Sequence, residues 1–387
     1  MKAYFDNAAT TAVDEVVFEK MRKYFTEEFG NTQSVHSVGR RSTAALDAAR
    51  DKVAKLINSS YKEVYFTSGG TEADNAAIKG IALASGKKKI IISSIEHSAI
   101  LSSAKDLEEA GFTVEYLRPN EKGIITAEEL ASKISSDVAL VSVMLANNET
   151  GVINPVKDLA EIARSYGVPF HTDAVQAAPS MRIDVRDLGV DAVTLSAHKI
   201  HGPKGAGCLY VKEGIPKKSL ISGGYQERGF RGGTVNLPLV VGFAEALSLN
   251  YEKLEERRKK TEDVRNYFEK RLAELEGVKV NFQESPRVVG VSSVNFSANA
   301  HALLTVLDLN GVSASVGSAC TAGSVLPSHV LRECGLDERD ALSTVRFSFS
   351  WDNTFEEVDY TIEILKDRLD EVRRTRLFAS NQKTFLA

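Results

Sequence analysis

The chain has few cysteines, no long hydrophobic run and no strong excess of charge, and each of these absences excludes a class of protein. Its 387 residues include three cysteines, Cys208, Cys320 and Cys334, and no CxxC pair. This argues against a disulfide scaffold and against a zinc ribbon. No apolar run approaches the roughly 20 residues that a membrane-spanning helix needs. The formal net charge of −4 at pH 7 gives no reason to expect nucleic acid or an anionic membrane as the main partner.

What remains is the composition of an ordinary globular protein. Hydrophobic residues make up 43% and charged residues 26% of the chain, which is enough for a large core. The length exceeds that of a typical single domain and predicts two domains, or one large domain with an appendage. The N-terminal sequence MKAYFDNAATT lacks the apolar core of a signal peptide, so the default expectation is a cytoplasmic location.

Strand and helix patterns alternate between about residues 60 and 215. The predicted strands are the β-branched runs at 63–68, 89–94, 112–117, 138–145, 168–173 and 191–196. Two of the intervening helices have recognisable ends: Thr126 and Glu129 resemble a capping box, and Pro155 and Gly167 bracket the next helix. This alternation predicts an α/β fold whose mostly parallel sheet is covered on both faces. In such sheets, ligands bind outside the carboxyl ends of the strands.

The pattern changes after residue 250. A long charged amphipathic helix is followed by strand-like runs at 278–282 and 290–296, a helix over 300–310, the strand TVRFSFS and a last helix from Thr354. This order predicts a smaller α+β domain. We place the large domain at residues 15–255 and the small domain at 1–14 and 256–387, with Cys320 in a loop of the small domain.

Three side chains at the predicted strand ends have the chemistry of a cofactor site. Lys199 follows the run 191–196; it is either a surface lysine or a desolvated amine that forms a Schiff base with an aldehyde. Asp173 either caps a helix or holds a protonated ring nitrogen, as pyridoxal phosphate (PLP) requires. His97 is either a capping or packed residue, or an imidazole that stacks on a flat cofactor.

The sequence Ser-Gly-Gly-Thr at 68–71 ends a strand and begins a helix. It is either a plain turn in which Thr71 caps the helix, with Asp74 also near the helix start, or an anion cradle made by backbone N–H groups. It is not a Walker loop, because the Gly-Lys-Ser/Thr ending is absent. An amine, an anion cradle and a carboxylate together are what a protein must provide for PLP.

Two further residues stand out near the C-terminus. Small, polar neighbours surround Cys320 and predict a mobile, accessible loop suited to a reactive thiolate, whereas Cys208 and Cys334 look like buried small hydrophobes. Arg346 interrupts an apolar strand, so it needs either a structural carboxylate or a substrate carboxylate as its partner.

Together these motifs resemble the cysteine desulfurases of the NifS/IscS type, which belong to the class V aminotransferase-like, fold-type I PLP enzymes. The similarity runs nearly from end to end and follows the order of the family's motifs. The matching segments are YFDNAATT, FGN…SVHSVGR, TSGGTEADN, EHSA, NNETG, HTDAVQ, SAHKIHGPKG, ERGFRGGTVN, GSACTAGS and PSHVL, and VRFSFS. The chain departs from the family's usual pattern at Thr32 and Gln33, at Gly70 and at Leu326. None of these departures removes a catalytic group.

The resemblance implies a large domain with a mostly parallel seven-stranded sheet, a smaller α+β domain, and PLP as cofactor. It implies that Lys199, His97 and Cys320 are the catalytic residues, with Cys320 as the sulfur acceptor. The residues that it implies for binding PLP are Gly70, Thr71, His97, Asn148, Asp173, Gln176, Ser196, His198, Lys199 and, from a partner subunit, Thr234. For the substrate it implies Asn31, Asn148 and Arg346.

The implied reaction converts L-cysteine to L-alanine and leaves the sulfur on Cys320 as a persulfide. An acceptor protein then takes the sulfur, most often an iron–sulfur scaffold, although tRNA thiolation or another thio-cofactor remains open. The shared Thr234 implies a homodimer. No resident metal site is expected; a role for Cys320 as a transient iron–sulfur ligand through a partner stays open. The alternatives are a selenocysteine lyase, another aminotransferase-like enzyme, and a degenerate homologue that serves as a binding scaffold.

Overall fold

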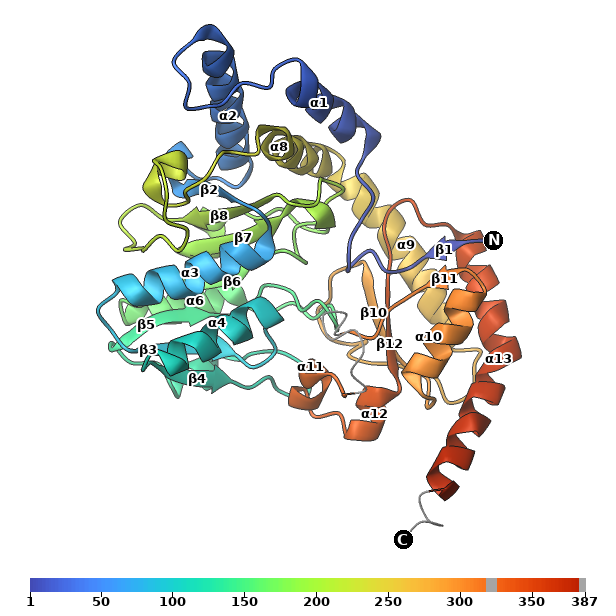
Figure 1. Cartoon of the computed structure of the whole chain (residues 1–387). Helices are drawn as coiled ribbons and strands as arrows, with labels where there is room; N and C mark the ends of the chain where they lie inside the picture. The colour runs from blue at the N-terminus through green and yellow to red at the C-terminus, as the bar shows by residue number, and fades with distance from the viewer. Residues whose placement is uncertain (318–325, 383–387) are drawn as a thin grey trace.

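A seven-stranded sheet forms the centre of the larger part of the molecule (Figure 1). The computed structural model describes residues 1–317 and 326–382, with side chains as far as residue 374. The strands are β2 (Val64–Thr67), β3 (Lys89–Ser93), β4 (Thr113–Leu117), β5 (Val138–Ser142), β6 (Phe170–Asp173), β7 (Ala192–Ser196) and β8 (Gly207–Val211). Their order in the sheet is β2-β8-β7-β6-β5-β3-β4, and only β8 runs antiparallel to its neighbours. The predicted α/β fold is confirmed, and β8 adds a strand that is not among the predicted runs.

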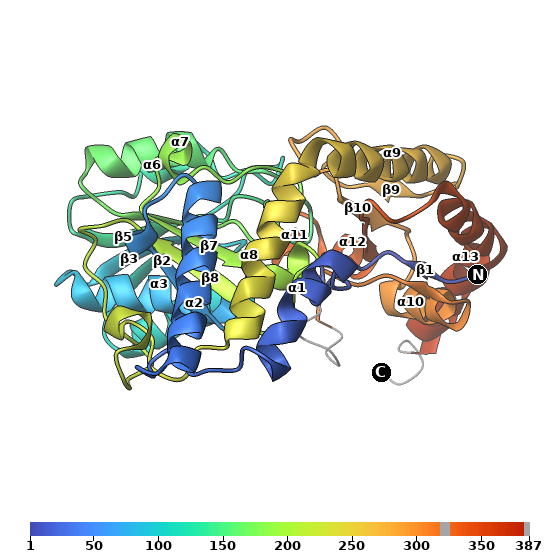
Figure 2. The same cartoon turned by 90° about the horizontal axis from the view of Figure 1, so that it is seen from above.

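Alternating side chains of the strands supply two separate apolar layers, one on each face of the sheet. In β3, Ile90 and Ile92 pack with helices α3 (Gly70–Ala84) and α4 (Ser98–Glu109), whereas Ile91 faces the opposite layer. That layer is built with α2 (Ser37–Leu56), α6 (Val156–Ser165) and α8 (Leu237–Glu252). The period of two along a strand accounts for this division, and Figure 2 shows the helices on both sides of the sheet.

The predicted helix ends are mostly correct. Helix α6 begins directly after Pro155, and the Thr126 side chain caps α5 (Ala127–Ala131) by accepting from the Glu129 N–H. The full capping box does not form, because the Glu129 carboxylate accepts from the backbone N–H of Arg118 instead. The prediction that Thr71 caps α3 is wrong: the N-cap residue is Gly69, and Thr71 lies in the first turn.

A second, smaller group of elements has its own core. The antiparallel sheet β12-β10-β9 and helices α9, α10 and α13 enclose apolar side chains that include Phe268 and Phe347. Phe5 belongs to the same core, because β1 pairs in parallel with β11. The smaller group of elements thus has a core separate from the two layers of the large sheet; the domain bounds stay a prediction. The bounds are β1 (Ala3–Tyr4), α9 (Leu254–Leu272), β9 (Lys279–Val280), β10 (Val291–Asn295), α10 (Ala300–Leu309), β11 (Val312–Ser313), β12 (Thr344–Ser348) and α13 (Phe355–Gln382).

The remaining elements connect these layers. They are α1 (Glu15–Thr26), η1 (Tyr61–Glu63), α7 (Val185–Leu188), η2 (Ala197–Lys199), η3 (Gln226–Gly229), α11 (His329–Glu333) and α12 (Glu338–Leu342). Across residues 1–317 and 326–382, no helix is both long and apolar enough to cross a membrane.

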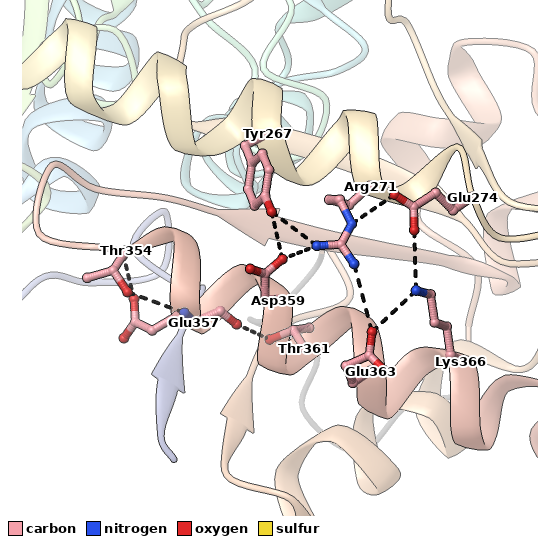
Figure 3. Close-up of polar contacts among 9 residues, drawn as sticks. All are labelled: Tyr267, Arg271, Glu274, Thr354, Glu357, Asp359, Thr361, Glu363 and Lys366. Carbon is pink, nitrogen blue, oxygen red and sulfur yellow. Dashed lines mark hydrogen bonds and ion pairs between the residues drawn. The ribbon is translucent and has the colours of Figure 1, made fainter.

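A network of polar contacts joins α9 to α13 on the outside of the smaller core (Figure 3). Arg271 is its centre: the guanidinium pairs with Asp359 of α13 and with Glu274, while Lys366 bridges from α13 back to Glu274. Tyr267 donates its hydroxyl to Asp359 at 2.8 Å. These contacts fix α13 against α9, so the last helix is anchored by charge as well as by its apolar face.

Candidate active site

A cavity of about 380 Å³ opens at the carboxyl ends of the parallel strands, which is where the sheet topology predicts a ligand site. The sequence-predicted residues that line it are Gly70, Thr71, His97, Asn148, Asp173, Gln176, Ser196, His198, Lys199 and Arg346. The structure therefore brings together side chains from the ends of β6 and β7, the start of α3 and strand β12. Cys320 lies outside the described residues.

Lys199 reaches the cavity from η2, directly after β7. Its Nζ donates to the backbone carbonyls of Ala8 at 2.6 Å and Ala9 at 2.8 Å. Both carbonyls come from the N-terminal segment, so residues far apart in the sequence fix the position of the amine. The two carbonyl oxygens are uncharged hydrogen-bond acceptors for the Lys199 amine.

Asp173 ends strand β6 with only 6% of its surface exposed. Its Oδ1 accepts from the Val175 N–H at 2.8 Å, so it caps the local turn and lines the cavity at the same time. Burial raises the pKa of Asp173, and the nearby His97 and Lys199 oppose that rise. The capping role and the cofactor-binding role that the sequence left open for Asp173 are therefore compatible in this structure.

His97 is the N-cap of α4 and also lines the cavity. Its Nδ1 accepts from the Ala99 N–H at 3.2 Å, so the neutral ring carries its proton on Nε2. Burial lowers the pKa of His97; the charge of Asp173 opposes this shift, and the charge of Lys199 adds to it. The imidazole is thus set up as a neutral ring whose protonated nitrogen is Nε2.

One end of the cavity is suited to an anion. The N-terminus of the 15-residue helix α3 provides Gly70 and Thr71, and backbone N–H groups at such an end attract negative charge. The Ser196 hydroxyl is buried beside them and has no hydrogen-bond partner among the described residues. His198 Nδ1 lies 3.2 Å from the Thr10 hydroxyl; burial, with the charges of Lys199 and Lys204, lowers its pKa to about 4. An orphaned hydroxyl at a helix N-terminus fits the phosphate group of PLP.

Arg346 and Asn148 also line the cavity. Arg346 is buried in β12, donates Nη1 to the Asn148 carbonyl at 2.9 Å and donates Nη2 to Asp6 Oδ1 at 2.8 Å. Asp6 is thus a structural carboxylate partner. Arg346 Nε and Asn148 Oδ1 are buried without a partner among the described residues, and these atoms remain for a ligand.

Two buried carboxyl groups in this cavity were not assigned a role from the sequence. Glu96 Oε1 accepts from the Ser93 hydroxyl at 2.6 Å and from the Met144 N–H at 2.7 Å, while Oε2 has no partner among the described residues. Burial, reinforced by the Asp173 charge, raises the pKa of Glu96 to about 8. Asp74 is buried inside α3 and does not mark the helix start; burial and Asp173 raise its pKa. The position of Glu96 just before His97, after a strand end, is the signal that could have indicated it.

Residues on both sides of the segment that carries Cys320 line the same cavity. They are Gly317 before it and His329 after it. His329 Nε2 lies 3.2 Å from the Glu96 carbonyl, and the neighbouring Ser328 donates its hydroxyl to Glu149. Burial raises the pKa of Glu149. Neither Glu149 nor His329 was predicted, although both belong to motifs noted in the sequence.

Two predicted residues do not line this cavity. Asn31 is exposed in the loop between α1 and α2, where its side chain accepts from the Gln33 N–H at 2.9 Å. Thr234 is exposed in the loop between η3 and α8. A single chain therefore does not bring them to its own site.

Comparison with known proteins places the chain in a family. The aminotransferase class-V family matches residues 3–361. A cysteine desulfurase IscS of Clostridium botulinum is 42% identical, covering 94% of this chain and 93% of that protein. A solved NifS-like protein superposes with a TM-score of 0.90 at 37% identity, covering 96% of this chain and 100% of that one. The structure of SspA in complex with cysteine has a TM-score of 0.81 at 35% identity, covering 90% of this chain and 99% of that one. The chain belongs to the aminotransferase class-V family of PLP-dependent enzymes and, within it, to the cysteine desulfurases.

Proposed function

We propose that this chain converts L-cysteine to L-alanine and transfers the sulfur to Cys320 as a persulfide, from which an acceptor protein takes it. The observation that carries this proposal is the convergence of the Lys199 amine, the Asp173 carboxylate and the anion-binding end of α3 on one cavity. The similarity to a protein solved in complex with cysteine supports the substrate.

The residues that line the cavity fit PLP. Lys199 would hold its aldehyde carbon, Asp173 its ring nitrogen, and Gln176 and Asn148 its ring oxygen. Ser196, His198, Thr71 and the Gly70 backbone would hold its phosphate, and His97 would cover the ring. When bound, PLP supplies an electron sink for the bonds at the substrate Cα.

The protein's own groups move the proton and the sulfur. Lys199 Nζ, once released from the Ala8 and Ala9 carbonyls, is the base that takes the Cα proton. His97, which lines the same cavity, can donate a proton from Nε2. The Cys320 thiolate attacks the substrate sulfur: the new S–S bond forms as the substrate C–S bond breaks. The carbon skeleton keeps the electron pair, gains a proton at Cβ and regains one at Cα to become alanine.

Arg346 orients the substrate carboxylate in this proposal. Its Nε is a donor without a partner among the described residues, and Nη2 donates one of its two N–H groups to Asp6. Nε–H and the second N–H of Nη2 are the pair that a carboxylate could bind bidentately. The third predicted substrate residue, Asn31, is assigned to the site of a neighbouring subunit.

A homodimer accounts for Asn31 and Thr234. Large apolar side chains are exposed on the same segments: Phe29 is 70% exposed and Val35 88% in the α1–α2 loop, and Tyr225 is 76% exposed beside η3. Figure 2 shows α1, the α1–α2 loop and the chain around η3 along one side of the molecule. Exposed apolar patches of this kind mark protein interfaces, so we propose that a second copy covers them and that Thr234 completes the partner's phosphate site.

Incubation of the purified protein with L-cysteine tests the function. Wild type should release alanine and, with a thiol reductant, sulfide. Cys320→Ala should lose both products, and Lys199→Ala should lose them together with the PLP absorbance. If Cys320→Ala keeps its alanine production, the chain is instead an aminotransferase-like enzyme; if selenocysteine alone is consumed, it is a selenocysteine lyase. If added PLP produces no absorbance band, the chain is a binding scaffold.

The acceptor is the remaining part of the proposal. We propose an iron–sulfur scaffold protein, with tRNA thiolation or another thio-cofactor pathway as the alternatives. Loading Cys320 with sulfur from labelled cysteine and then adding a candidate scaffold distinguishes them, because only the true acceptor should remove the label at a rate comparable with turnover.

A further inference from the structure

Thr11, in the segment between β1 and α1, lies against the turn that carries Lys199, and its side chain is buried. Its N–H donates to the His198 carbonyl at 2.9 Å. Its hydroxyl donates to the same carbonyl at 3.0 Å and accepts from the His201 N–H at 3.0 Å. A single buried hydroxyl thus joins the residue before Lys199 to the backbone that follows it.

The backbone of this turn needs such support. His201 has a φ angle of 58°, a left-handed conformation that is uncommon for a residue other than glycine and persists only where its surroundings hold it. His201 is buried, so without the Thr11 hydroxyl its N–H would lose its acceptor in a place that water does not reach freely. The Asp14 N–H donates to the His201 carbonyl at 2.9 Å. The N-terminal segment therefore binds both backbone groups of His201.

The same segment also holds the far end of the Lys199 side chain, because Nζ donates to the carbonyls of Ala8 and Ala9. In the proposed reaction the amine leaves these carbonyls to take the proton from the substrate Cα. The position of the lysine backbone then determines where the amine can reach. The contacts of Thr11 persist through this movement, since they are made with main-chain atoms of His198 and His201.

We propose that the Thr11 hydroxyl is a positioning group for Lys199: by closing the turn from His198 to His201, it holds the lysine backbone where the released amine reaches the substrate Cα. Thr11 does not line the active-site cavity, so it acts through Lys199 and not on the substrate. A misplacement of about 1 Å at a reacting group can slow a reaction roughly 100-fold. The inference rests on the role of base that is proposed for Lys199.

Three substitutions separate the effect of the hydroxyl from that of the side-chain shape. Thr11→Val keeps the shape and removes the hydroxyl, whereas Thr11→Ser keeps the hydroxyl and removes a methyl group. Thr261→Val is the matched control. Thr261 is also buried, but its hydroxyl donates to the Arg257 carbonyl within α9 at 2.8 Å, so the same substitution removes a hydrogen bond that does not involve the Lys199 turn.

Exchange of the Cα proton of L-alanine in heavy water isolates the Lys199 step from the sulfur transfer. Lys199 takes the Cα proton while the electron pair stays with the carbon skeleton, exchanges the proton with solvent, and returns a deuteron to the same carbon. Proton NMR of alanine with the PLP-loaded protein follows this exchange. Thr11→Val should slow it at least about tenfold at saturating alanine with little change in the KM for alanine. Thr11→Ser should recover most of the rate, and Thr261→Val should match wild type.

The absorbance band of bound PLP gives a second readout that does not depend on turnover. The pH midpoint of this band reports how the Lys199 nitrogen is held at the aldehyde carbon of PLP, so Thr11→Val should shift it and Thr261→Val should not. Thermal midpoints of all three variants, measured alongside, show how much stability each substitution costs.

The proposal fails if Thr11→Val exchanges the alanine proton at the wild-type rate, if Thr11→Ser is as slow as Thr11→Val, or if Thr261→Val is equally slow. Wild-type protein that binds PLP but exchanges no proton would instead contradict the role of Lys199 as base and the desulfurase activity. The absorbance midpoint would then decide the role of Thr11, and an unchanged midpoint in Thr11→Val would overturn it.

Discussion

A buried ion pair between Arg50 and Glu227 allows a quantitative prediction. Both side chains are only 3% exposed. Two parallel hydrogen bonds of 2.7 Å join the guanidinium to the carboxylate, and Glu227 Oε2 also accepts from the Phe66 N–H at 2.9 Å. The pair thereby ties η3 to helix α2 and strand β2.

Glu227→Gln removes the negative charge and leaves the Arg50 guanidinium buried. Breaking a buried pair in this way costs about 3–5 kcal/mol. Glu227 and Arg228 also have φ angles of 47° and 57°, a left-handed backbone that persists only when its surroundings hold it. We therefore expect a large loss of stability and, because Thr234 follows in the same loop, faster release of PLP.

Urea unfolding of the PLP-loaded protein, followed by circular dichroism, measures the loss of stability. The control is Glu213→Gln: the Glu213 side chain is 70% exposed and lies 4.0 Å from Lys62, so its removal should change the free energy of unfolding by less than about 0.5 kcal/mol. Equal unfolding midpoints for the two variants would refute the reasoning, because burial would then make no difference to how much an ion pair contributes to stability.

Three further predictions concern the active site. Lys199→Ala should abolish alanine production whereas Lys204→Ala, which changes an exposed residue, should retain it; equal loss in both would contradict the assignment of the amine. The pKa of Glu96 is raised from 4.5 to about 8, so between these pH values the folded state binds a proton that the unfolded state releases, and stability falls as pH rises. Glu96→Gln should remove this fall, so its free energy of unfolding should rise relative to that of wild type by about 1.4 kcal/mol per pH unit at most. Thermal or urea unfolding at pH 5 and pH 8 measures this difference. Parallel pH profiles of the two proteins would show that Glu96 is ionised throughout. Arg346→Lys should raise the KM for cysteine about tenfold or more with a smaller change in kcat, since lysine lacks the fork that binds a carboxylate; an unchanged KM would mean that Arg346 serves only Asp6.

The sequence predicted the parts of the site that follow from the topology of a parallel sheet. Asp173 and Lys199 each come after an apolar run, and the carboxyl ends of parallel strands meet at one edge. Their convergence on one cavity therefore needed only the strand assignments. The motif order added the identity of the ligand, which strand positions alone do not specify.

Burial and long-range pairing could not be predicted in this way. Asp74 and Glu96 have raised pKa values because the sheet, α3 and Asp173 surround them, and no local pattern records that. Asp6 and Arg346 are 340 residues apart in the chain. Asn31 and Thr234 are a different case, since one chain does not bring them to its own site and the role proposed for them needs a second copy.

The N-terminal segment connects the two cores at the point of reaction. Strand β1 pairs with β11, Phe5 is packed in the smaller core, and the Ala8 and Ala9 carbonyls hold the Lys199 amine. A rigid shift of the smaller core against the sheet is consequently transmitted to the catalytic nitrogen through a tether of a few residues. The substrate contact proposed for Arg346, on the smaller core, and the freedom of the amine are thus mechanically linked.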